Sequence, residues 1–359
     1  MNTSQRLQRI QERIVRRGLD SLLVSKLPNI RYLSGFSGSE AVMLITREQA
    51  LLITDFRYIE QAQEECKGLE IVERKGPLLR VLVSQIRQHG LRKLGFEAEA
   101  LSFDQYSQLS KALARRRTLP VKGLVEDMRE TKDAEEVGRI RGAIKIAEEA
   151  FKRLRRRLKS GLSERQVAAR LDFSMQEAGA DGPAFNTIVA LGERASLPHA
   201  PLTDRRAREK DSLLVDWGAR RKSYNSDLTR VVFLNKITPQ ARKIYSIVLE
   251  AQSRAIEKVR AGVGAREVDL AARDYIEKRG YGKNFGHGLG HGIGLEVHEG
   301  PRLNRINRRP LREGMVVTVE PGIYIPHWGG IRIEDMVLVK KDGFEVLSHT
   351  PKGLDEVII

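Results

Sequence analysis

The sequence predicts a two-domain protein in which a smaller α/β domain precedes an α+β domain. Three observations predict this organisation: a length of 359 residues, alternating helical and strand-like patterns over the first 120 residues, and separate groups of helices and strands in the remainder. We expect the first domain at 1–122, a linker at 123–132 and the second domain at 133–359.

The elements of the first domain follow from the spacing of its apolar residues. Apolar residues at helical intervals predict a helix over 3–17, and a second helix is expected over 57–65. The glycine- and serine-rich segment 29–36 is expected to be a loop. Short uninterrupted apolar runs predict buried strands at 22–24, 41–45 and 51–54. Such alternation is typical of a sheet with helices packed on it.

Helix-start and helix-stop signals organise the second domain. Capping patterns begin helices at Asp133, Ser163 and Thr238, and a fourth helix is expected over 265–278. Glycines are expected to end these helices, at Gly161 for the first and at Gly262 for the third. Strands are predicted at 212–216, 226–233, 315–320, 331–334 and 336–339. This order predicts helices on one face of an antiparallel sheet.

Four acids stand at the ends of apolar strand segments in the second domain. Asp216 follows Leu-Leu-Val, and Asp227 comes eleven residues later, across a predicted hairpin. Glu320 follows Val-Val-Thr-Val, and Glu334 follows fourteen residues on, also across a predicted strand pair. A buried carboxylate without a partner is costly, and a bound cation removes that cost. The pattern therefore indicates a site for divalent metal.

A glycine-rich tract adds imidazoles to this set. Residues 286–294 alternate glycine with other residues and contain His287 and His291. The tract lacks the lysine of a P-loop and the spacing of a dinucleotide fingerprint, so we expect its glycines to let backbone pass close to a metal. Oxygen ligands with one imidazole suit Mn²⁺, Fe²⁺, Co²⁺ or Zn²⁺, and two such ions can activate a water for hydrolysis.

Composition restricts the compartment and the partners. The chain has one cysteine, Cys66, so no disulfide forms within it and a cytoplasmic location is expected. The sequence contains no apolar run long enough to predict a membrane span. The formal net charge of +16 admits nucleic-acid binding, but we favour a solvated arginine-rich surface because aromatic residues make up only 6% of the chain.

At this point five segments resemble those of the pita-bread metallopeptidases. They are VDWGA, SDLTR, GHGLGHGIGLEVHEGP, VEPGIYI and IRIED. More narrowly, they resemble the proline-specific branch, which contains Xaa-Pro dipeptidase (prolidase) and aminopeptidase P. NIRYLSGFSGS and LLITDFRYIEQA resemble the creatinase/prolidase N-terminal domain, so the resemblance covers essentially the whole chain. It implies a creatinase-like α/β domain followed by a pita-bread (creatinase/aminopeptidase) α+β domain.

The resemblance also implies roles for individual residues. Asp216 would hold one metal, His291 and Glu320 the second, and Asp227 and Glu334 would bridge both. Glu320 or Glu334 would carry a proton during catalysis. The residues that would meet the substrate, its intermediate or a ligand acid are His199, His287, His298, Arg302 and Arg332.

The activity implied is hydrolysis of the Xaa-Pro peptide bond by a hydroxide bridging two divalent metal ions per subunit. Mn²⁺ is expected first, with Co²⁺, Zn²⁺ or Fe²⁺ as alternatives. The substrate is a peptide with proline at its second position. The short first domain favours a dipeptidase, with an aminopeptidase P acting on longer peptides as the alternative and a non-catalytic nucleic-acid or protein-binding relative as a more distant one. The resemblance further implies a homodimer.

Overall fold

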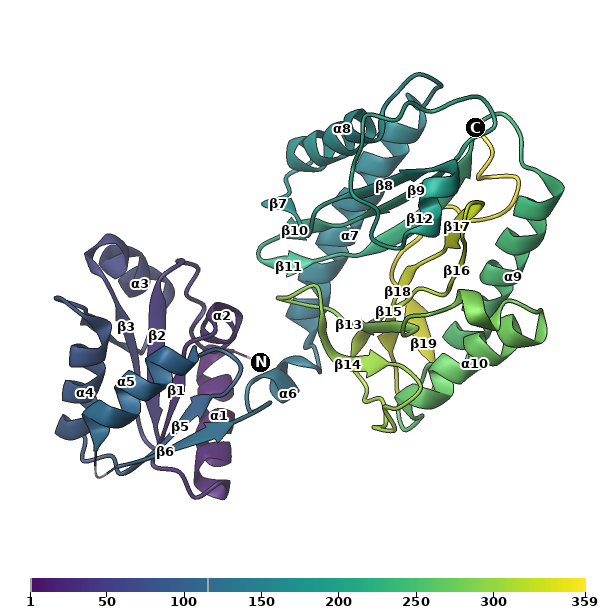
Figure 1. The fold of residues 1–359 in the computed structure, drawn as a ribbon. Coiled ribbons are helices and arrows are strands. Elements are labelled where there is room, and N and C mark those ends of the chain that lie inside the picture. Colours follow the sequence, from purple (N-terminus) through teal and green to yellow (C-terminus); the bar gives the residue numbers. More distant parts are fainter. Residues whose placement is uncertain (1, 115) are drawn as a thin grey trace. The chain divides into compact units, whose positions relative to one another are not determined.

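A computed structural model describes residues 2–114 and 116–359, which form two compact units, 1–129 and 130–359 (Figure 1). The division falls between Arg129 and Glu130, inside the segment 123–132 that the sequence marks as a linker. None of the helices described is both long and apolar enough to cross a bilayer.

The first unit is built on a six-stranded mixed sheet with the order β4-β3-β2-β1-β5-β6. Its strands are β1 (Ser21–Val24), β2 (Ala41–Thr46), β3 (Ala50–Thr54), β4 (Glu70–Glu73), β5 (Lys93–Glu97) and β6 (Arg117–Val121). Its helices are α1 (Thr3–Arg16), α2 (Leu27–Ser34), α3 (Ile59–Glu65), α4 (Leu78–Gln88), α5 (Phe103–Leu113) and α6 (Glu126–Arg129). Leu23, Leu44 and Ile86 lie in the core between this sheet and its helices.

The segment expected to be a loop, 29–36, is mostly helix α2, so that prediction was wrong. Pro28 stands in the first turn, where its fixed φ suits a helix and its missing N–H costs nothing. Gly35 ends the helix with φ 83°, the left-handed conformation that glycine adopts without strain. The glycine and serine residues of this segment mark the end of the helix and not an open loop.

The second unit contains four small sheets. Their orders are β12-β9-β8, β11-β10-β7, β14-β13-β15-β18-β19 and β16-β17, and all the pairings within them are antiparallel. The first two contain β7 (Gly182–Pro183), β8 (Ile188–Leu191), β9 (Ser212–Trp217), β10 (Ala219–Arg221), β11 (Tyr224–Asn225) and β12 (Leu228–Phe233). The last two contain β13 (Gly290–Gly292), β14 (Glu299–Leu303), β15 (Val316–Val319), β16 (Gly322–Ile325), β17 (Gly329–Arg332), β18 (Asp335–Val339) and β19 (Phe344–Val346).

Four long helices flank these sheets: α7 (Ala134–Arg155), α8 (Glu164–Glu177), α9 (Pro239–Ile256) and α10 (Ala265–Lys278) (Figure 1). Capping boxes begin α7 at Asp133 and α8 at Ser163, and Thr238 caps α9, as the sequence predicts. The predicted helix ends at Gly161 and Gly262 were wrong by about a turn and a half. Both glycines have positive φ and lie in the turns that follow the helices.

Apolar packing fixes the helices to the sheets on both sides of the unit. Trp217, at the end of β9, stacks on Phe151 of α7 with ring centroids 4.3 Å apart, and its indole N–H donates to the Ala147 carbonyl at 2.9 Å. On the other side, α9 and α10 pack in one core with Val317 and Ile331. The strand ends that carry the predicted ligands are thereby held from both flanks.

Candidate metal centre

The predicted hairpin of Asp216 and Asp227 is present. Strands β9 and β12 pair antiparallel, with Asp216 opposite Thr229, and Asp227 stands directly before β12. The predicted strand pair of Glu320 and Glu334 is also present. Strand β15 pairs with β18 up to Val319 and Asp335, and β16 pairs with β17 from Gly322 and Arg332 in the same register, so the two acids stand opposite each other at an interruption of one hairpin. Glu334 also forms a bridge to Thr229.

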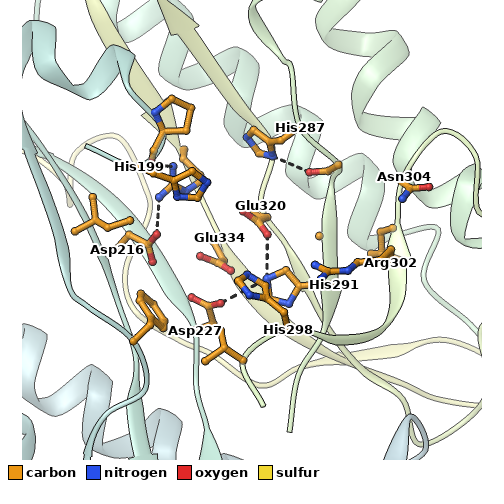
Figure 2. Close-up of a pocket in the computed structure, with 18 of the residues that line it drawn as sticks. His199, Asp216, Asp227, His287, His291, His298, Arg302, Asn304, Glu320 and Glu334 are labelled. Carbon is orange, nitrogen blue, oxygen red and sulfur yellow. Dashed lines mark hydrogen bonds and ion pairs between the residues drawn. The ribbon is translucent and has the colours of Figure 1, made fainter. Parts of the chain in front are cut away.

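The five predicted ligands all line one pocket with a volume of about 560 Å³. Figure 2 shows Asp227, Glu334, Glu320 and His291 converging, with Asp216 at one side. One ligand atom from each of Asp227, His291 and Glu334 lies within 4.8 Å of the other two. The His291 Nε2 is 3.6 Å from the Asp227 Oδ2 and 3.4 Å from the Glu320 Oε1.

The backbone fixes the tautomer of His291. Its Nδ1 lies 3.1 Å from the Gly292 carbonyl, which can only accept, so Nδ1 carries the proton and Nε2 presents its lone pair to the site. Burial lowers the pKa of His291 to about 3, so the ring is neutral. The close contacts between Nε2 and the two carboxyl groups are therefore not ion pairs, because the imidazole carries no charge.

These residues fit a pair of divalent cations. The Oδ1 of Asp216 and the Oε1 of Glu334 are buried and have no hydrogen-bond partner among the described residues. Orphaned carboxylate oxygens facing an imidazole lone pair are costly without a cation and are ordinary metal ligands with one. Four carboxylates and one imidazole form a hard donor set of the kind that Mn²⁺ and similar ions accept.

Without metal, the site resists ionisation of its acids. Burial is the largest cause, and it raises the pKa of Asp227, of Glu334 and, less strongly, of Asp216. Glu320 shows the same effect, and burial raises its pKa to about 7. The neighbouring carboxylates add to the rise for Asp227 and Glu334, since like charges cannot all be held close together.

Arg332 lies behind the acids and donates to four partners. These are the Asp216 Oδ2 at 2.6 Å, the Thr229 Oγ1 at 3.0 Å, the Tyr324 Oη at 2.9 Å and the Pro198 carbonyl at 3.4 Å. The Thr229 hydroxyl in turn donates to the Glu334 Oε2 at 2.7 Å. Arg332 is only 3% exposed, so its contacts hold Asp216 and Glu334 in place.

His287 closes the far side of this network. Its Nδ1 donates to the Gly288 carbonyl at 2.7 Å, which leaves Nε2 to accept from the Tyr324 hydroxyl at 3.0 Å. Burial lowers the pKa of His287 to about 4 and keeps the ring neutral, as this arrangement requires. The chain of donors therefore runs from Arg332 through Tyr324 to His287.

The other predicted residues form the open side of the pocket. His199, His298 and Arg302 are exposed and line it, and the His298 ring lies edge-on to His291 with centroids 4.4 Å apart. Burial lowers the pKa of His298. Within residues 2–114 and 116–359, the guanidinium of Arg302 makes no hydrogen bond or ion pair, in contrast to that of Arg332. Apolar side chains complete the lining: Phe185, Ile188, Pro198, Val297 and Leu303.

Sequence reasoning missed the side chains that hold the ligands. Thr229 and Tyr324 stand inside the SDLTR and VEPGIYI segments, but their spacing in the sequence does not predict which side chains they contact. Thr318 accepts from the His291 N–H at 3.0 Å and donates to the Glu320 Oε1 at 3.3 Å. A usable signal stands two residues before Tyr324: a Cβ on Gly322 would lie 2.6 Å from the Tyr324 hydroxyl oxygen, so the glycine of VEPGIYI makes room for this side chain.

Comparison with known proteins identifies the family of this chain. The family model for metallopeptidase family M24 matches residues 138–341, and that for the creatinase/prolidase N-terminal domain matches residues 6–131. The chain is 38% identical to a Xaa-Pro dipeptidase of Pyrococcus horikoshii over 353 residues, which is 98% of this chain and 99% of that protein.

Solved structures are equally similar. A Xaa-Pro dipeptidase from Bacillus anthracis superposes with a TM-score of 0.97 at 39% identity and covers all of both chains. An X-Pro aminopeptidase from Thermotoga maritima gives a TM-score of 0.90 at 39% identity, with 97% of this chain and 99% of that chain covered. The chain belongs to metallopeptidase family M24, with a creatinase/prolidase N-terminal domain before its pita-bread catalytic domain.

Proposed function

We propose that this chain is a Xaa-Pro dipeptidase that depends on two divalent metal ions per subunit, with Mn²⁺ as the expected metal. The five convergent ligands with their orphaned carboxylate oxygens carry the proposal. The relatives named above include Xaa-Pro dipeptidases over nearly the full length of this chain. When bound, the metals supply an activated water and a Lewis acid for the scissile carbonyl.

In the proposed centre, Asp216 would hold one metal, and His291 and Glu320 would hold the second. Asp227 and Glu334, which have ligand atoms within 4.8 Å of each other and of one on His291, would bridge the two. Arg332 keeps Asp216 oriented through its contact at 2.6 Å. Glu320 lies on the pocket wall and is the candidate to move a proton to the leaving amine.

The open side of the pocket then binds the substrate. Among the described residues, the Arg302 guanidinium on the pocket lining has no hydrogen-bond or ion-pair partner, whereas the donors of Arg332 already serve Asp216, Thr229 and Tyr324. We therefore assign Arg302 to the carboxylate of the proline residue, a contact that requires the peptide to end there. His199 and His298 flank the pocket and would contact the scissile bond or the intermediate, and His287 would lie beside the proline ring.

Hydrolysis of Leu-Pro compared with Arg-Pro-Pro tests this function. The protein is loaded with Mn²⁺ or Co²⁺, assayed on both peptides, and assayed again after chelation. A dipeptidase cleaves Leu-Pro only, and only with metal. Cleavage of Arg-Pro-Pro would identify an aminopeptidase P instead, and no metal-dependent cleavage of either peptide would overturn the proposal.

Three further features belong to the same proposal. We propose a homodimer, which sedimentation of the purified protein tests directly. A cytoplasmic location suits a chain whose single cysteine, Cys66, is buried and free. We also retain 133–359 as the catalytic domain, 1–122 as the smaller domain and 123–132 as their linker, which limited proteolysis can test.

A further inference from the structure

Gln252 lies in the middle of α9 and is fully buried, yet it is a polar side chain on the apolar face of that helix. Its Nε2 donates to two backbone carbonyls, Val319 O at 3.1 Å and Ile333 O at 3.0 Å. Its Oε1 accepts from the Lys352 ammonium at 2.7 Å. Carbonyls only accept and an ammonium only donates, so the orientation of the amide is fixed.

The two carbonyls belong to the residues that directly precede Glu320 and Glu334. Both residues stand where the hairpin that carries the two glutamates is interrupted, because β15 pairs with β18 up to Val319 and Asp335 and β16 pairs with β17 from Gly322 and Arg332. Between these two paired parts the backbone makes one long hydrogen bond, from the Ile333 N–H to the Pro321 carbonyl at 3.4 Å. The Gln252 amide, on a third element, therefore binds one carbonyl of each strand at the interruption between the two glutamates.

We propose that Gln252 is a positioning residue of the metal centre: its amide sets the distance between the backbones that carry Glu320 and Glu334. This inference rests on the metal centre proposed above. Metal affinity depends on ligands held at the correct spacing, and partners outside the ligand set supply that spacing. Thr318 and Thr229 orient the two carboxylates themselves, so the contribution of Gln252 is to the backbones alone.

The main variant is Gln252→Met, which keeps the length and most of the volume and removes all three hydrogen bonds. We expect the metal dissociation constant, measured by calorimetry on the metal-free protein, to rise about 10- to 100-fold. The visible spectrum of the Co²⁺-loaded variant should change as well, because it reports ligand geometry. At saturating metal, kcat for Leu-Pro should fall while KM stays within about twofold, since Arg302 is untouched.

Thr238→Ala is the matched control. Thr238 caps the same helix through its Oγ1 and the Ala241 N–H, so the variant weakens α9 without reaching the strand ends. It should lower the unfolding temperature and leave the metal dissociation constant and the Co²⁺ spectrum unchanged. A Gln252→Met protein that behaves in the same way would show a merely structural glutamine and overturn the inference.

Gln252→Glu covers the case in which the methionine variant does not fold. The glutamate side chain keeps an acceptor for Lys352, so the variant should fold. It places a second oxygen against the two carbonyls, so the variant should bind metal more weakly. Wild-type affinity in this variant would contradict the inference. A wild-type protein that binds no divalent metal would overturn the metal centre itself, which is a separate outcome.

Discussion

At the residue scale, the proposed site gives Arg302 and Arg332 different tasks. Arg302 follows the GHGLGHGIGLEVHEGP segment and Arg332 stands inside IRIED, and the sequence leaves open which one meets a substrate carboxylate and which one holds a ligand acid. Burial separates them, because Arg332 is enclosed by Asp216, Thr229 and Tyr324 while Arg302 is exposed on the pocket lining. A guanidinium without partners is available to a substrate carboxylate, which it can bind through two parallel hydrogen bonds.

Replacing Arg302 with alanine should therefore weaken substrate binding. Loss of a charge-assisted hydrogen bond costs about 1.5–3 kcal/mol, so KM for Leu-Pro should rise roughly 10- to 100-fold with metal affinity unchanged. Steady-state kinetics at saturating Mn²⁺ measure this change. Arg305→Ala is the control, because this arginine is exposed, stands three residues after Arg302 and lies outside the pocket. Equal KM values for the two variants would exclude Arg302 from the carboxylate site.

The raised pKa values of the acids predict how stability depends on pH. In the metal-free fold, burial raises the pKa of Glu320 from 4.5 to about 7, so between these values the folded state binds more protons than the unfolded state. The stability of the metal-free protein should therefore fall as pH rises from about 4.5 to 7. Metal binding needs the ionised acids and should release protons.

Thermal unfolding at pH 5 and at pH 8, with and without Mn²⁺, tests this direction of the pH dependence. The gain in unfolding temperature on adding Mn²⁺ should be larger at pH 8 than at pH 5. Calorimetry of metal binding in two buffers of different ionisation enthalpy would count the protons released. A gain that is larger at pH 5 would contradict the pKa directions given for these acids.

At the scale of elements, glycines allow strand β13 to lie against both its neighbours. A Cβ on Gly290 would lie 2.0 Å from the Thr318 carbonyl oxygen, and one on Gly292 would lie 1.9 Å from that of Gly300. His291 stands between these two glycines, so the close backbone approach places its ring in the site. The close backbone approach at Gly290 and Gly292 fits the interpretation of this glycine-rich tract, and its nearness to a metal stays a prediction.

Alanine at Gly290 should force β13 away from β15. We expect a loss of about 3 kcal/mol in unfolding free energy, because the clash is with backbone that cannot rotate away. Gly138→Ala is the contrasting variant, since Gly138 is exposed within α7 and has no atom within 4 Å of its Cβ position. That change should stabilise the protein by about 0.5–1 kcal/mol. Denaturant unfolding measures both, and a tolerated Gly290→Ala would refute the close approach.

These elements also show how far the sequence alone predicts this fold. Local signals located the helix starts, because capping is a property of four neighbouring residues, as at Asp133 and Thr238. They did not predict the bridge between Glu334 and Thr229, since contacts between segments far apart in the chain are not a local property. The ligand letters can be recognised in the chain, but the contacts of Thr229, Tyr324 and Gln252 exist only after folding.

At the scale of the whole molecule, the chain consists of two compact units, and all five proposed ligands lie in the second. Metal should then stabilise the second unit selectively. At a free metal concentration of 100 times Kd the gain is about 2.7 kcal/mol, which corresponds to several degrees for a unit of this size. Scanning calorimetry should show one transition that moves with Mn²⁺ and one that does not. Equal shifts of both would contradict this assignment.

The most direct test of the account counts metal ions. Dialysed protein is titrated with Mn²⁺, and the bound ions per chain are compared between wild type and Asp227→Ala alongside Leu-Pro hydrolysis. We expect two ions per chain in the wild type, and in Asp227→Ala fewer ions with hydrolysis reduced by several orders of magnitude. A wild-type chain that binds no Mn²⁺, or an Asp227→Ala variant that hydrolyses Leu-Pro at the wild-type rate, would contradict the dinuclear centre.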